Sequence, residues 1–310
     1  MSNSINTLLV FLIMIAAGVV LAATEILDEK TSKKLTKIVL IVCIPSTMFA
    51  NVFQYFDPQI LKEAGTALLV PLLSVFTGWM IGMLLARILP IKATSRGVFA
   101  VCFAFSNTVF VGLPVNQALF GEAASVPALF YFLGNTLMFW TLGAWGIRRD
   151  TGVKAPLFSL QSLKALLSPA LITLIVSLAL LFLRVPIPKF LLQAASKLGA
   201  PGTPMAMIIA GGVIWRGVKK GIWRRWEAFV ATAGKIAVLP LIALAFSTIF
   251  RIDPFLKQIF IAQAAMPLMS QSTIIAQNYG ADDELASATS VITMLSLLIT
   301  IPVLSAVFGG

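Results

Sequence analysis

The stretch Phe105-Ser106-Asn107-Thr108-Val109-Phe110-Val111-Gly112-Leu113-Pro114 places small polar residues, a glycine and a proline inside a segment that is otherwise apolar enough to cross a membrane. A second stretch of this kind, Ala265-Met266-Pro267-Leu268-Met269-Ser270-Gln271-Ser272, lies towards the end of the chain. In hydrocarbon every backbone N–H and C=O must be paired, so interrupted helix survives there only inside protein or beside a water-filled cavity. Two such stretches in one chain indicate a transport site.

The composition points to a membrane protein. The 310 residues are 59% hydrophobic and 11% charged, with a mean hydropathy of +0.96, whereas soluble domains carry about 25% charged residues. Many apolar runs exceed the roughly 18 residues that a helix needs to cross a bilayer. We therefore expect an all-α integral membrane protein of the inner or plasma membrane.

Several function classes lack their usual residues. The chain has no histidine, and its two cysteines, Cys43 and Cys102, lie within apolar spans as core residues do. No nucleophile–base pair and no paired acids lie at membrane depth, so we expect no enzyme activity, no metal and no cofactor beyond a coupling ion, Na⁺ or H⁺. The net charge of +11 does not require a nucleic-acid partner, because basic residues sorted to one membrane face give the same total.

The apolar pattern predicts ten membrane spans. They lie at residues 5–22, 36–54, 64–87, 97–120, 125–147, 165–183, 201–217, 226–249, 256–279 and 285–308. The connections on one side hold 16 Lys and Arg and those on the other side hold 6. Positive-inside sorting then places both termini outside the cytoplasm. The first span is expected to be retained, because the residues before it carry no positive charge, unlike a signal peptide.

The chain also divides into two similar halves. Shifting the first half by 159 residues superimposes Pro45 on Pro204 and Gly121 on Gly280, and lays spans 1–5 on spans 6–10. We predict a first five-helix repeat at 1–148, a short cytoplasmic connector at 149–163 and a second five-helix repeat at 164–310. Because five is odd, the second repeat enters from the opposite side, which is the inverted repeat found in many secondary transporters.

The candidate binding residues lie at the two interruptions. Asn107 and Thr108 lie roughly 16 Å into span 4, near the bilayer centre, and Gly112 and Pro114 allow its helix to open there. In span 9, Pro267 is followed by Ser270, Gln271 and Ser272. If both helices break, two helix N-termini point into the protein and favour a carboxylate. The alternative is a pair of proline kinks whose free backbone groups are paired by neighbouring helices.

Lys235 is the one ionisable residue deep within a span, and no acid lies at comparable depth. A buried cation is a candidate anion partner, although a lysine that extends along its own helix to the interface is the alternative. Gln263 and Asn135 are weaker candidates, because single amides inside helix bundles usually serve packing. A site that is neutral to positive suits a small organic anion.

Asn107-Thr108-x-x-x-Gly112-x-Pro114 resembles the hallmark of the auxin efflux carrier family, which includes plant PIN carriers and bacterial malonate-type permeases. Met266-Pro267, Tyr279-Gly280 and the Ala-rich last span are similar to the family's C-terminal signature. The resemblance covers essentially the whole chain. One position departs from the plant carriers, which have Pro where this chain has Ser106, so the helix can break at Ser106-Asn107 or later, at Gly112–Pro114.

This resemblance implies a mechanism as well as a fold. Spans 4 and 9 would cross at their breaks, spans 1, 2, 6 and 7 would form a scaffold and homodimer interface, and the remaining spans would move as an elevator. Asn107 would contact the substrate carboxylate and Pro267 would form the second crossing element. Two other functions remain open, a sodium symporter of the bile-acid type and, in a different class, a membrane receptor or binding module.

Overall fold

The computed structural model describes residues 2–55, 58–152, 169–219, 221 and 224–308. The described residues are mainly helical, and their β pairing is limited to one antiparallel bridge between Ser106 and Leu268. Most of the predicted connector, at 153–163, and the first residues of the predicted span 165–183 lie outside the described residues.

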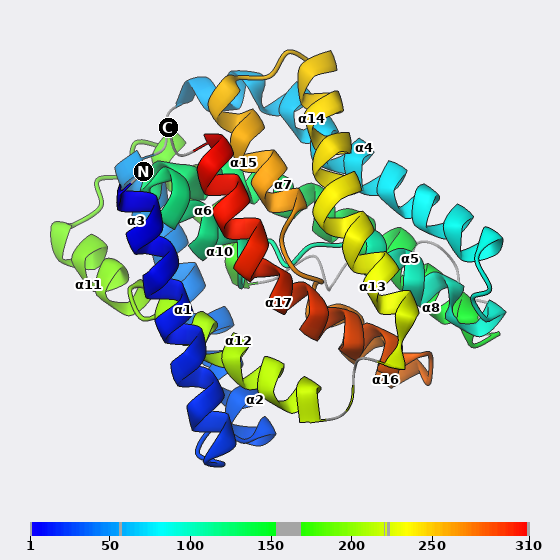
Figure 1. Ribbon diagram of the computed structural model, residues 1–310. Helices are drawn as coiled ribbons and strands as arrows, with labels where there is room; N and C mark the ends of the chain where they lie inside the picture. Colours follow the sequence, from blue (N-terminus) through cyan, green and yellow to red (C-terminus); the bar gives the residue numbers. More distant parts are fainter. Residues whose placement is uncertain (1, 56–57, 153–168, 220, 222–223, 309–310) are drawn as a thin grey trace.

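The described residues form sixteen α-helices, labelled up to α17, and short 3₁₀ and π turns separate several of them (Figure 1). The α-helices are α1 (Ser2–Ala23), α2 (Glu29–Ile38), α3 (Ile44–Tyr55), α4 (Pro58–Ile88), α5 (Arg96–Ala104), α6 (Gly112–Phe120), α7 (Ser125–Met138), α8 (Ala144–Asp150), α10 (Pro169–Phe182), α11 (Lys189–Gly199), α12 (Gly202–Lys219), α13 (Trp226–Ala233), α14 (Leu239–Ile249), α15 (Pro254–Ala264), α16 (Gln271–Tyr279) and α17 (Asp283–Phe308). The 3₁₀ turns are η2 (Ala93–Ser95) and η3 (Glu122–Ala124), and the π turns are η1 (Val39–Cys43), η4 (Phe139–Gly143) and η6 (Gly234–Val238).

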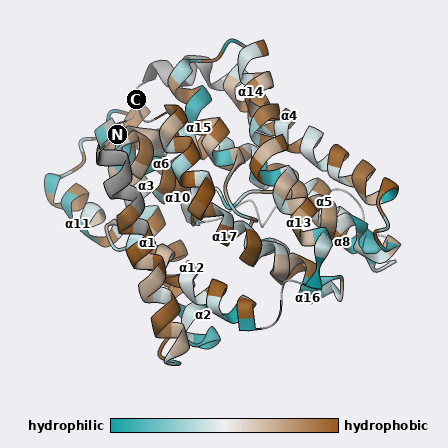
Figure 2. Ribbon diagram, in the orientation of Figure 1, coloured by the Kyte–Doolittle hydropathy of each residue, from teal (hydrophilic) through white to brown (hydrophobic). Residues whose placement is uncertain are grey.

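Six continuous helical segments of the described chain are long and apolar enough to cross a membrane. They are Glu29–Gln54, Gly65–Ile88, Glu122–Asp150, Lys189–Lys219, Trp226–Ile249 and Asp283–Phe308. Large apolar side chains such as Ile13, Leu84, Leu241 and Ile299 lie exposed on the helices, where lipid would cover them. Figure 2 shows hydrophilic residues gathered near helix ends, for example around α8 and α16. The prediction of an all-α integral membrane protein is thus confirmed at this level.

The predicted spans differ from the helices in two respects. The segments at 97–120 and 256–279 are each two helices, separated by Phe105–Val111 and by 265–270. The connection expected before residue 201 instead contains α11, which begins directly after Pro188 and ends at Gly199. Pro188 suits the start of a helix because the first-turn N–H groups have no intrahelical partner.

The helices form two bundles that each combine both halves of the chain. In the first bundle, which contains α1, α2, α3, α10, α11 and α12, α1 packs along α12 and α3 packs on α10 and α11. In the second bundle, which contains α4–α8 and α13–α17, α4 packs on α5 and α7, α14 on α15, and α13 on α17. The first bundle therefore corresponds to the predicted spans 1, 2, 6 and 7. In Figure 1 it occupies the left side of the view and most of the second bundle the right.

Glycines allow the closest approaches inside each bundle. A Cβ added to Gly211 would meet the Ile15 carbonyl, which brings α12 against α1. A Cβ added to Gly97 would likewise meet the backbone of Gly146, which brings α5 against α8. Between the bundles, α17 packs on α12 and α1, and α3 approaches α7 and η3. Backbones meet within a bundle at these points, so each bundle is internally tight.

Candidate functional site

The first interruption spans Phe105–Val111, between α5 and α6. It contains Ser106-Asn107, the earlier of the two predicted positions, and ends where the later one, Gly112–Pro114, begins α6. Phe105 leaves the helix with extended torsion angles, and α6 begins at Gly112. Pro114 is then the third residue of α6, where a backbone N–H would have no intrahelical partner. The Gly112 N–H donates to the Asn107 carbonyl at 2.8 Å. The proline therefore begins a new helix and does not kink a continuous one.

The second interruption lies beside the first and pairs with it. Ser106 and Leu268 form the antiparallel bridge. The Asn107 N–H donates to the Pro267 carbonyl at 2.7 Å, and the Met269 N–H donates to the Phe105 carbonyl at 3.1 Å. Each broken segment therefore supplies partners for backbone groups that the other would leave unpaired at membrane depth. The bridge makes the two breaks one structural unit.

A polar residue from the following long helix holds each break. At the first break, Asn135 of α7 accepts from the Ser106 N–H at 3.1 Å and donates to the Ser106 carbonyl at 3.0 Å. At the second, Thr293 of α17 accepts from the Leu268 N–H at 3.0 Å. Asn135 and Thr293 are fully buried. The predicted candidate Asn135 thus supports the backbone of the first break.

Lys235 lies at the first break and is fully buried. Its Nζ donates to the Ser106 hydroxyl at 3.2 Å, and that hydroxyl donates to the Ala264 carbonyl at the end of α15 at 2.9 Å. Gly234 permits this position, because a Cβ there would meet the ring of Phe103. The ion pairs found in the described residues involve Lys33 and Arg225, and none of them reaches Lys235. The ammonium therefore lies inside the protein and does not extend to the interface.

Two amide side chains, those of Asn107 and Gln263, form further hydrogen bonds between the two broken segments. Asn107 donates to the Ser270 hydroxyl at 2.9 Å and accepts from the Phe110 N–H at 3.2 Å. Gln263 donates to the carbonyls of Thr108 and Ala128 at 3.2 and 3.4 Å. Its Oε1 is buried without a hydrogen-bond partner and lies where a Cβ of Gly112 would stand. A side chain larger than hydrogen at position 112 would therefore displace the Gln263 amide.

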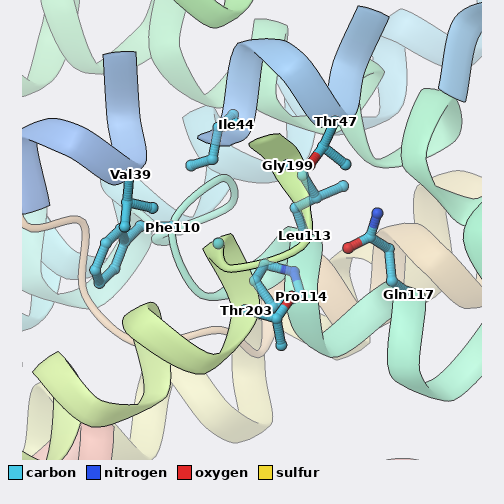
Figure 3. A pocket seen from close by; sticks show the side chains of 10 residues that line it. Val39, Ile44, Thr47, Phe110, Leu113, Pro114, Gln117, Gly199 and Thr203 are labelled. Atoms are coloured by element: carbon cyan, nitrogen blue, oxygen red, sulfur yellow. The ribbon is translucent and has the colours of Figure 1, made fainter. Parts of the chain in front are cut away.

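A narrow pocket with a cavity volume of about 20 Å³ lies between the two bundles (Figure 3). The second bundle contributes one face of α6 and Phe110, two residues before it, at the spacing i, i+3, i+4 and i+7 that marks one side of a helix. The first bundle contributes residues of η1 and α3, the last residue of α11 and the start of α12. The lining residues are Val39, Ile44, Thr47, Phe110, Leu113, Pro114, Gln117, Gly199, Gly202 and Thr203.

Two helix N-termini face this pocket. Leu113 and Pro114 belong to the first turn of α6, and Gly202 and Thr203 open α12. A helix N-terminus carries about half a positive charge. At α6 the Gly112 N–H already donates to the Asn107 carbonyl and Pro114 has no N–H, so α6 offers the pocket mainly the positive end of its dipole. The side chains that line the pocket are neutral, with polar atoms from Thr47, Gln117 and Thr203. The arrangement favours a small anion with an apolar body.

The structure separates the predicted residues into three positions. Pro114 lines the pocket, while Gln271 begins α16 with an exposed side chain. The others gather at the paired breaks, directly behind α6: Asn107, Thr108, Gly112, Asn135, Lys235, Gln263, Pro267 and Ser270. The sequence predicts that the N-termini after the two breaks, those of α6 and α16, face the same site. In the structure the N-terminus of α6 faces the pocket together with that of α12.

Thr47, Gln117 and Thr203 were missed by the sequence reasoning. A signal existed for each of them. Gln117 lies three residues after Pro114 on the same helix face. Thr47 lies two residues after Pro45, and Thr203 directly precedes Pro204, the proline that the 159-residue shift superimposes on Pro45. Sequence alone did not mark these residues as binding residues, because a single Thr or Gln in an apolar helix usually serves packing.

Comparison with known proteins supplies a family and two relatives. Residues 4–305 match the family model described as "Membrane transport protein". The chain is 27% identical over 301 residues to an uncharacterized transporter of Methanocaldococcus jannaschii, covering 95% of this chain and 96% of the relative. It is 24% identical over 310 residues to an uncharacterized transporter of Methanothermobacter thermautotrophicus, covering 98% of each. The match therefore extends over the whole of the fold described above.

Proposed function

Because the chain belongs to the membrane transport protein family, the family of the auxin efflux carriers, we propose that it is a secondary transporter of a small organic anion. The substrate class is a carboxylate, with a dicarboxylate such as malonate or an auxin-like acid as the compounds to test first. The observation that carries the proposal is the pocket between the two bundles, at which the N-termini of α6 and α12 meet.

The lining of the pocket supports a small acid. The cavity volume of about 20 Å³ has room for about one water molecule, so we propose that a carboxylate enters when the two bundles move apart. Apolar side chains and neutral polar groups would contact the body of the substrate, and the two helix N-termini would contact its carboxylate. The Lys235 ammonium at the first break adds positive charge, and none of the ion pairs of the described residues involves it. The electrostatics thus oppose a cation and favour an anion.

The packing of the helices supports alternating access. We propose that the second bundle moves against the first as an elevator, because the pocket lies between two internally tight bodies. In this proposal the ten spans form two inverted five-helix repeats, at 1–148 and 164–310, joined by a cytoplasmic connector at 149–163. The broken helices cross at the Ser106–Leu268 bridge, both termini are outside the cytoplasm, and two copies associate through the first bundle.

Uptake of labelled malonate and an aromatic acetic acid into proteoliposomes tests the proposal. Lys235→Met should lower uptake about 10–100-fold, the equivalent of losing about 1.5–3 kcal/mol of interaction with a charge. Its thermal stability should stay the same or rise, because an apolar side chain replaces a buried charge. The matched control is Lys189→Met, at an exposed position on α11, which should retain wild-type uptake.

Several outcomes would contradict parts of the proposal. Wild-type rates in Lys235→Met would remove the lysine from the site. A sodium gradient that accelerates uptake would favour a symporter of the bile-acid type, and a proton gradient that does so would favour H⁺ coupling. Carboxylates that raise the melting temperature but never cross the membrane would indicate a receptor.

A further inference from the structure

A cluster of four polar residues lies at one end of the pocket. We call Asn51, Gln117, Glu122 and Ser125 the pocket-end cluster. The Asn51 Nδ2 donates to the Glu122 carboxylate at 2.8 Å and to the Ser125 hydroxyl at 2.7 Å. The Gln117 Nε2 donates to the same two atoms, at 2.8 and 3.0 Å. Two amide nitrogens therefore share two acceptors.

This cluster joins the two bundles. Asn51 belongs to α3 in the first bundle, whereas Gln117, Glu122 and Ser125 belong to α6, η3 and α7 in the second. Asn51 and Ser125 are buried. The hydrogen bonds that hold the breaks, by contrast, lie within the second bundle. Any sliding of one bundle along the other must break the hydrogen bonds of Asn51.

The cluster is also continuous with the pocket. Gln117 lines the pocket, and Thr47 lies one helical turn before Asn51 on α3. In Figure 3 the Gln117 amide points towards the side of the pocket on which Thr47 lies. The two N–H groups of Gln117 are both engaged by the cluster. A carboxylate that accepted from Gln117 would compete with Glu122 and Ser125 for them.

We propose that the pocket-end cluster is a latch that closes the pocket beside Glu122 and fixes α6 against α3, and that a carboxylate bound at Gln117 releases it. Asn51 is the positioning residue of this latch, since it supplies the hydrogen bonds from the first bundle. The inference rests on the proposed function, because release by a carboxylate has meaning only for a carrier of such anions. The latch would open once in each transport cycle.

Disulfide trapping tests the latch directly. In a variant with Cys43→Ala and Cys102→Ala, the pair Asn51→Cys and Ser125→Cys should form a disulfide on mild oxidation, and uptake should stop until a reductant is added. The matched control pair is Ser95→Cys with Asp282→Cys, whose side chains are also hydrogen-bonded, at 2.6 Å, but within the second bundle. That disulfide should leave uptake running. Undiminished uptake with the Asn51–Ser125 pair oxidised would overturn the proposal.

A second measurement does not depend on transport. Thr47→Cys in the same background should react slowly with a membrane-impermeant maleimide added on the face where Glu122→Cys reacts. Adding Asn51→Ala should raise the rate about 5–30-fold, as expected when hydrogen bonds worth about 1–2 kcal/mol are lost from the closed state. Asn278→Ala, at an exposed position on α16, is the control and should leave the rate unchanged.

The two measurements separate the latch from the proposed function. Malonate should raise the labelling rate of Thr47→Cys when Asn51 is present. In the double variant Thr47→Cys with Asn51→Ala, malonate should not change the labelling rate. If no carboxylate crosses the membrane but Asn51→Ala accelerates labelling, the latch stands and the proposed function fails. Equal labelling with and without Asn51→Ala would overturn the latch whatever the uptake assay gives.

Discussion

The two breaks resemble each other in sequence and in backbone, and differ in their surroundings. Each is bridged to the other through Ser106 and Leu268 and is held by a polar residue of the next long helix. The helix after the first break, α6, lines the pocket, whereas Gln271, at the start of α16 after the second break, is exposed. The first break also has the buried Lys235 beside it.

This difference shows how far the likeness of the two breaks extends. Both breaks leave backbone N–H and C=O groups that need partners inside the protein. The charge and exposure around each break differ, because they depend on residues from other helices. We infer that the first break serves the substrate and that the second mainly completes the backbone pairing of the first.

Asn135→Ala should have the largest effect of the variants that test this comparison. It removes the partner of the Ser106 N–H and one of the two donors to the Ser106 carbonyl, which still accepts from the Thr108 N–H at 3.0 Å. A buried group left unpaired costs about 1–3 kcal/mol and a lost hydrogen bond about 0.5–1.5 kcal/mol, so the expected loss of stability is about 1.5–4.5 kcal/mol. It is measured as a lower melting temperature of the purified protein in nanodiscs. Transport should be lost as well.

Thr293→Val gives the matching test at the second break. It is isosteric and leaves one N–H, that of Leu268, without its acceptor, so the expected loss is about 1–3 kcal/mol. The control is Thr289→Val on the same helix, whose hydroxyl donates to the Leu285 carbonyl of its own turn. If Thr293→Val destabilised the protein as much as Asn135→Ala, the two breaks would be held equally and the comparison would fail at this point.

Gly112→Ala should have a smaller effect, confined to the first break. An added methyl group would meet the Gln263 Oε1 and approach the Asn107 carbonyl to 3.1 Å. Overpacking of this kind costs about 1–3 kcal/mol, and displacement of the start of α6 should reduce uptake. Gly65→Ala is the control, because nothing lies within 4 Å of the added Cβ there, and alanine favours a helix over glycine. A melting temperature for Gly112→Ala equal to that of Gly65→Ala would contradict this assignment.

Local sequence was sufficient for most of the helices and for the existence of the two breaks, although it missed α11 and left the exact position of the first break open. Gly112, Pro114 and Pro267 act on their own backbone, so their effect can be read from the chain alone. The tertiary position of Lys235 could not be predicted, because its side chain reaches Ser106, 129 residues away in the sequence. The pocket could not be predicted either, since Thr47, Gln117 and Thr203 come from three helices that meet only in the fold. The helix that faces α6 across the pocket is α12. The packing of the two bundles places it there, and the similarity of the two halves of the sequence does not predict it.

The smallest expected effect tests whether α12 or α16 contributes the second helix N-terminus at the substrate site. Thr203→Val removes one hydroxyl from the pocket at the start of α12, and one hydrogen bond of about 0.5–1.5 kcal/mol corresponds to about a 2–12-fold change in affinity. We expect a rise of that size in the malonate concentration that gives half-maximal uptake, with the melting temperature unchanged. Gln271→Ala, at the equivalent start of α16, removes a larger polar side chain and should alter this concentration less than Thr203→Val does. The opposite order would place the substrate at the second break, and would mean that the exposed start of α16 closes over the substrate in another conformation of the cycle.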